Sequence, residues 1–144
     1  MKNNYPDYIK ELEVAFSDLD PMGIVWHGNY LKYFDYAREG LLKSLNVNLF
    51  QFFVETGYAF PVIRSNIKYI SPLKYGDIFL CQATLIEWRR KITMEFEIRR
   101  KKDNCLCATG RGEQAAVKAP EMKLEYIIPE ELQKLFSLGS GKVE

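Results

Sequence analysis

A single long helical pattern, set among stretches that alternate like strands, most limits what this chain can fold into. Its apolar side chains recur every three or four residues on one stripe, Tyr30, Phe34, Ala37, Leu41 and Leu45. From Tyr58 onward the period changes to two. Strands are expected over residues 9–17, 60–70, 77–88, 91–100 and 105–118, and short helices over 49–55 and 129–138. One apolar helix and strands longer than the usual five to six residues predict an α+β fold, with a strongly curved antiparallel sheet wrapped around that helix.

The size and charge of the chain exclude several classes of protein. Its 144 residues fit one domain, expected over residues 1–138, with a mobile tail over 139–144. A net charge of +1 gives no general attraction to nucleic acid, and no apolar run approaches the roughly 18 residues of a membrane span. We see no signal peptide, and the three cysteines lack metal or redox spacing. We therefore expect free thiols, a cytoplasmic location and no membrane insertion.

The loop over residues 16–30 gathers groups that could carry chemistry. It contains two carboxylates, Asp18 and Asp20, and His27, which is the single histidine of the chain. Pro21 fixes its own φ and disfavours a helical conformation at Asp20, while Gly23 permits a positive φ. We therefore expect Asp20 to be extended on a constrained turn. Because one histidine cannot build a histidine-based metal cluster, we predict no metal site.

This loop delivers the chain to a helix start near Gly28 or Asn29, where Asn29 is a favourable N-cap type. The first amides of a helix lack partners inside it, and the helix dipole makes that end positive. Asp20 is thus a candidate nucleophile or general base for acyl hydrolysis, with the carbonyl oxygen at the His27 N–H. The alternative, that Asp20 caps a turn and His27 packs or faces solvent, stays open. Asp18 is expected to be structural.

A second group of interest is the basic run that starts at Glu87. Arg89, Arg90 and Lys91 follow Trp88 at a strand end, which suits phosphate recognition with a ring surface for stacking. The alternative is a solvated hairpin turn. A nucleotide would have to bind without a glycine-rich phosphate loop, because the chain contains none.

Together these residues resemble a known family. The run from Asp18 to Tyr30, followed by Tyr33-Phe34-Asp35, is similar to the signature of hotdog-fold acyl-CoA thioesterases of the 4-hydroxybenzoyl-CoA thioesterase class and of the Tol-Pal-associated subgroup. The block from Glu87 to Lys91 also looks like the bacterial 4-hydroxybenzoyl-CoA enzyme. His27 resembles the Tol-Pal-associated subgroup, yet that subgroup often has tyrosine where this chain has Phe16. The acyl group, aromatic or short aliphatic, therefore stays open.

The resemblance implies a fold, a reaction and an assembly. It implies a hotdog fold, catalysis by the Asp20 carboxylate and polarisation of the thioester by the His27 amide, with no cofactor beyond the CoA of the substrate. It implies CoA phosphates at Arg89, Arg90 and Lys91, and homotetramers built as dimers of dimers with active sites at the dimer interface. The substrate pocket is expected to include four more residues of the motif, Gly23, Val25, Trp26 and Tyr30.

Two other functions compete with the thioesterase. A hotdog hydratase or dehydratase would use His27 with Asp35 or Glu39, although the spacing does not resemble the block typical of that family. A non-catalytic acyl-CoA-binding or envelope-complex scaffold module would bind CoA esters or a partner and release no thiol. The residues alone do not separate direct attack by Asp20 from deprotonation of water.

Overall fold

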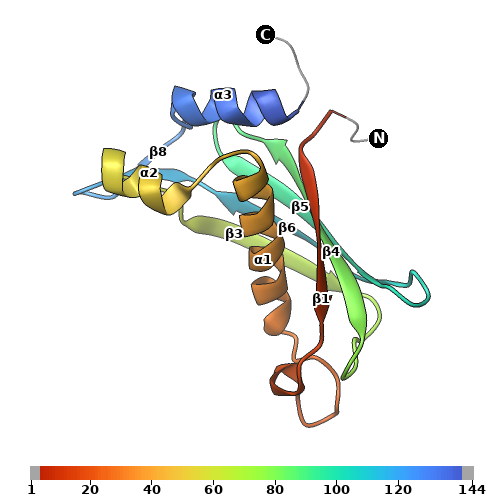
Figure 1. Cartoon of the computed structure of the whole chain (residues 1–144). Coiled ribbons are helices and arrows are strands. Elements are labelled where there is room, and N and C mark those ends of the chain that lie inside the picture. Colours follow the sequence, from red (N-terminus) through yellow and green to blue (C-terminus); the bar gives the residue numbers. More distant parts are fainter. Residues whose placement is uncertain (1–3, 141–144) are drawn as a thin grey trace.

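The computed structural model describes residues 4–140, in which one antiparallel sheet curves around a long helix (Figure 1). The helix is α1 (Asn29–Ser44), and the sheet has five strands in the order β1–β4–β5–β6–β3. These strands are β1 (Asp7–Glu13), β3 (Val62–Tyr69), β4 (Ile78–Glu87), β5 (Ile92–Arg100) and β6 (Leu106–Gln114). The predicted fold, one helix wrapped by a curved antiparallel sheet, is confirmed.

Smaller elements close the ends of this core. They are the 3₁₀ turn η1 (Phe16–Asp18), α2 (Leu49–Thr56), β2 (Tyr58–Ala59), β7 (Ala116–Lys118), β8 (Lys123–Glu125) and α3 (Glu130–Gly139). Strands β2, β7 and β8 form a second, three-stranded sheet. None of the helices within residues 4–140 is long and apolar enough to cross a membrane.

The stripe predicted for the long helix faces the sheet. Its members from Tyr30 to Leu41 are at most 3% exposed, and only Leu45 is partly exposed. Phe34 stacks on Phe96 of β5 with ring centroids 4.5 Å apart. A Cβ atom at Gly110 of β6 would lie 2.4 Å from the Phe34 ring, so a glycine there allows the helix to approach the sheet closely. This apolar contact holds the start of α1 in a fixed place.

Three boundaries differ from the sequence predictions. The first strand ends at Glu13 rather than 17, because the Asp18 side chain accepts a hydrogen bond from the Ala15 N–H (3.1 Å) and the chain turns into η1. The stretch 105–118 is two strands, because the chain changes sheets at Ala115, whose N–H donates to Pro61. Gly139 belongs to α3, and the rest of the predicted tail, apart from Ser140, lies outside the described residues.

Candidate active site

The two carboxylates of the loop have different surroundings, although only one residue separates them. Asp18 is 5% exposed and accepts hydrogen bonds from the Tyr33 hydroxyl (2.8 Å), the Ala15 N–H and, at 3.4 Å, the Lys32 ammonium. Burial alone would raise the pKa of Asp18, but these donors outweigh it and the pKa is lowered. Asp18 is therefore a structural anchor between η1 and α1, as predicted.

Asp20 is held by hydrogen bonds of its backbone, whereas its carboxylate makes few hydrogen bonds within residues 4–140. The Asp20 N–H donates to Ile24 (2.8 Å), and the Gly23 N–H donates to the Asp20 carbonyl (3.0 Å). Gly23 has a φ of +80°, as the turn requires. Within residues 4–140, the Asp20 carboxylate accepts one hydrogen bond, from the Met22 N–H at 2.8 Å. Most of its lone pairs thus remain available to a substrate or a water molecule.

The start of α1 supplies free amides beside this carboxylate. Gly28 is the N-cap, one residue earlier than the sequence favoured, and the Asn29 side-chain amide donates to the Asp18 carbonyl (2.9 Å). The Trp26 N–H also donates to Asp18 (2.9 Å). The N–H groups of His27 and Gly28 have no acceptor among the described residues. They form the positive end of the helix dipole, which suits an oxyanion.

A cavity of about 360 Å³ joins these groups. It is lined by Asp20, Met22, Ile24, Val25, His27, Tyr30, Tyr69, Ile70, Ser71 and Pro72. Asp20, His27, Val25 and Tyr30 therefore line one cavity, whereas their catalytic and substrate-binding roles stay predictions. Burial raises the pKa of Tyr30 to about 12, so its hydroxyl stays protonated near neutral pH.

Two residues predicted for the pocket lie outside its lining. Trp26 is 49% exposed, and its ring packs against Gly28 and the His27 ring. Gly23 serves the turn, and a Cβ atom there would meet nothing within 4 Å. The opposite wall, Tyr69 to Pro72, was not predicted, because nothing local in the sequence indicates that the end of β3 folds back onto the start of α1.

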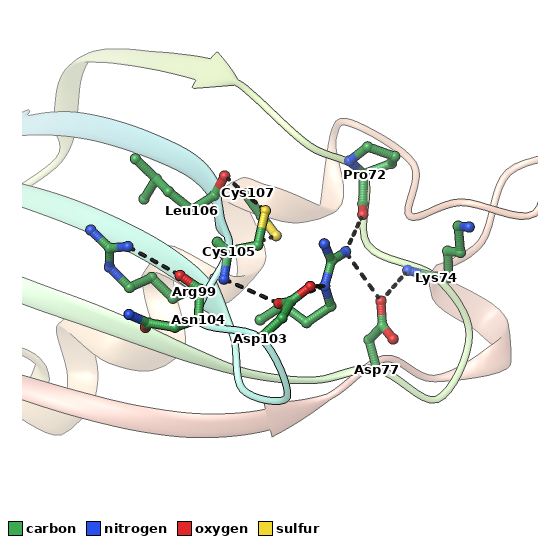
Figure 2. A network of polar contacts seen from close by, with 10 residues as sticks. Pro72, Lys74, Asp77, Arg99, Asp103, Asn104, Cys105, Leu106 and Cys107 are labelled. Carbon is green, nitrogen blue, oxygen red and sulfur yellow. Dashed lines mark hydrogen bonds and ion pairs between the residues drawn. The ribbon is translucent and has the colours of Figure 1, made fainter.

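A polar network holds that opposite wall in place (Figure 2). Arg100, the last residue of β5, donates to the Pro72 carbonyl (3.1 Å) and to both Asp103 oxygens (3.1 and 3.2 Å). Its guanidinium also lies 3.9 Å from Asp77, which accepts the Lys74 N–H at 2.9 Å. The wall is thus tied to β5 by a charged side chain with several partners.

The basic turn between β4 and β5 lies away from the cavity. The cavity adjoins the Ile78 end of β4, and the basic turn follows Glu87 at the other end (Figure 1). Ten residues at about 3.4 Å each put the two regions roughly 30 Å apart within one chain. The chain alone therefore does not bring the predicted phosphate-binding residues to Asp20.

The residues of the basic turn differ in whether their side chains are free to bind a phosphate. Arg89 and Arg90 are exposed. Lys91 pairs with Glu113 (2.9 Å), and this hydrogen bond is the main cause of the lowered pKa of Glu113. Trp88 corrects a prediction: it is 7% exposed and its indole N–H donates to Ser137 of α3 (3.1 Å), so its ring is part of the core rather than a stacking surface.

Comparison with known proteins links this geometry to one family. The model of the thioesterase-like superfamily matches residues 14–136. The chain is 38% identical over 64 residues to a 1,4-dihydroxy-2-naphthoyl-CoA hydrolase from Thermosynechococcus vestitus, covering 44% of each chain. It is 34% identical over 80 residues to the 4-hydroxybenzoyl-CoA thioesterase of Pseudomonas sp., covering 54% of this chain and 57% of that one. The aligned segments thus span about half the length of these relatives.

A solved structure has the same fold over most of its length. It is a 1,4-dihydroxy-2-naphthoyl-CoA thioesterase from Synechocystis, with a TM-score of 0.83 at 22% identity, covering 90% of this chain and 95% of that one. At this identity the likeness concerns the fold, and it confirms the predicted hotdog architecture.

Proposed function

The chain belongs to the thioesterase-like superfamily, and from this premise we propose that it hydrolyses the thioester of an acyl-CoA to the free acid and CoA. The observation that carries this proposal is the cavity, which Asp20 and His27 line together at the start of α1. A carboxylate with one hydrogen bond and a free helix amide are the two groups that thioester hydrolysis needs. The names of the two relatives above support an acyl-CoA substrate.

The chemistry follows from these two groups. In one route the Asp20 carboxylate attacks the thioester carbon, the C–S bond breaks, CoA leaves as a thiolate, and water then hydrolyses the mixed anhydride. In the other route Asp20 removes a proton from a water molecule, which attacks the same carbon; the C–S bond then breaks, and CoA leaves as a thiolate that takes up that proton. In both routes the carbonyl oxygen gains negative charge, which the free N–H groups of His27 and Gly28 stabilise. Neither route uses a metal or a cofactor.

We propose an aromatic or short-chain acyl group. The aromatic side chains His27, Tyr30 and Tyr69 line the cavity beside the apolar Ile24 and Val25. Rings of this kind favour edge-to-face contact with an aromatic acyl group. Both relatives act on aromatic acyl-CoA compounds according to their names.

The CoA phosphates require a second copy of the chain in this proposal. Arg89 and Arg90 are exposed, but roughly 30 Å separates them from the cavity along β4. The outer strand β3 has one sheet neighbour and exposes Val62 and Ile63. An edge strand that exposes apolar residues at one end can pair with another copy. We therefore propose a homo-oligomer, a dimer of dimers in keeping with the sequence resemblance, in which one copy supplies Arg89 and Arg90 to the other.

A thiol-release screen tests the function. Benzoyl-CoA, a short-chain and a long-chain acyl-CoA are incubated with the full chain, and free thiol is measured. We expect release from the aromatic or short-chain ester. Tight binding of the esters without thiol release would support a scaffold module instead, and hydration of an enoyl-CoA without thiol release would support a hydratase. The free thiols of Cys81, Cys105 and Cys107 fit the reducing cytoplasm that we propose as its location.

A further inference from the structure

The first turn of α1 contains two peptide groups whose amides are free. The carbonyl of Trp26 accepts the Asn29 N–H at 2.9 Å. The carbonyl of His27 accepts the Tyr30 N–H at 3.4 Å, which is a long bond. In a trans peptide the N–H points opposite to the C=O, so the His27 and Gly28 amides point away from the helix body. Neither amide has an acceptor within residues 4–140.

Tyr69 reaches this turn from the far side of the cavity. It is the last residue of β3, and its hydroxyl donates to the His27 carbonyl at 3.0 Å. Its ring meets the Tyr30 ring edge-to-face, with centroids 5.0 Å apart, and lies 6.4 Å from the His27 ring. The hydroxyl thus binds the carbonyl whose own helical bond is the weaker of the two in this turn.

We propose that Tyr69 is a positioning residue, whose hydroxyl fixes the His27–Gly28 peptide so that the amides at the start of α1 face the thioester oxygen. This inference rests on the proposed thioesterase function. A carbonyl that accepts a hydrogen bond polarises its peptide and strengthens the N–H on the other side. Tyr69 therefore acts on the transition state through the backbone and does not touch the reacting atoms with its hydroxyl.

The hydroxyl is tested by Tyr69→Phe, which keeps the ring and its contacts. We expect kcat for a CoA ester to fall about five-fold, the effect of one neutral hydrogen bond, with KM unchanged within two-fold. In the ¹⁵N–¹H spectrum of the same variant we expect the Gly28 amide resonance to shift selectively. The matched control is Tyr58→Phe, which removes a hydroxyl bonded to Glu125 (3.1 Å) outside the cavity. The control should leave kcat, KM and the Gly28 amide resonance unchanged.

Several outcomes would overturn the role of Tyr69. These are an unchanged kcat, a rise in KM alone, which would indicate ground-state binding, or a Gly28 resonance that does not move. If the unmodified chain releases no thiol from any ester, the proposed function fails and the positioning role fails with it. An active unmodified chain with a fully active Tyr69→Phe variant overturns the positioning role alone, so the two failures are distinguishable.

Discussion

The two ends of the main sheet both carry polar groups but use them differently. At the cavity end, Asp20 and the first amides of α1 keep free hydrogen-bonding capacity beside an open space. At the basic-turn end, Lys91 is paired with Glu113 and Trp88 is buried under α3, which leaves Arg89 and Arg90 exposed.

The same contrast occurs within one loop. Among residues 4–140, the Asp18 carboxylate accepts three hydrogen bonds and is buried, whereas the Asp20 carboxylate accepts one and lines the cavity. Residue type therefore does not single out a candidate catalytic group in this chain. Unused hydrogen-bonding capacity does, at Asp20.

The largest expected effect is at the cavity end. Asp20→Asn should lower kcat for an acyl-CoA by at least about 100-fold, because it removes the nucleophile or general base. The far-ultraviolet circular dichroism spectrum and the melting temperature should stay unchanged, since the carboxylate accepts only the Met22 N–H among the described residues. Turnover is measured by thiol release at saturating substrate. Near-normal turnover of several acyl-CoAs would remove Asp20 from the mechanism.

Asp18→Asn should affect stability instead. Losing charge-assisted hydrogen bonds at a buried site should lower the free energy of unfolding by about 2 kcal/mol, measured by urea denaturation at neutral pH. The pKa of Asp18 is lowered on folding, so its contribution is complete above the unfolded pKa of about 3.9 and is lost as pH falls through the folded value. The difference in the free energy of unfolding between the Asp18→Asn variant and the unmodified chain should therefore shrink in acid.

The control for this prediction is Glu97→Gln, which breaks a surface pair with Arg99. An exposed pair contributes little, so the stability of this variant should match the unmodified chain. If Asp18→Asn and Glu97→Gln lowered the free energy of unfolding equally, the distinction between the buried Asp18 and a surface ion pair would not hold.

The exposed arginines, Arg89 and Arg90, allow a test at the basic-turn end of the sheet. Arg89→Ala and Arg90→Ala should each raise KM for a CoA ester about ten-fold, the scale of one lost contact to a phosphate. KM for the matching acyl-pantetheine, which lacks the nucleotide, should stay the same. Lys91→Ala is the comparison variant, because its ammonium is already bound to Glu113. Equal effects on both substrates would refute phosphate binding at the two arginines.

The smallest effect is expected at Trp88. Trp88→Phe removes the hydrogen bond to Ser137 and should lower the free energy of unfolding by about 1 kcal/mol. Because the ring is buried, KM for the CoA ester should not change. A rise in KM specific to the nucleotide would restore the stacking role that the sequence suggested.

Predictions from the sequence were correct where all the residues of a pattern lie in one segment. The stripe from Tyr30 to Leu41 predicted the buried helix face, since a 3.6-residue period fixes which side chains share a side. Asp20 and His27 were predicted together because one short loop holds both. Tyr69 could not be assigned to the cavity, because 42 residues separate it from His27 in the sequence. Their contact forms only when the end of β3 folds back onto the start of α1. Trp88 was misplaced because Ser137 of the covering helix α3 lies 49 residues later in the sequence.

We propose that a thioester carbonyl meets the start of α1 next to position 20. A crystal structure of the Asp20→Asn variant with an unhydrolysed aromatic acyl-CoA measures this directly. We predict the thioester oxygen about 3 Å from the His27 nitrogen, and the thioester carbon next to the side chain at position 20. An acyl group bound away from the cavity, or a carbonyl oxygen turned away from His27, would contradict it.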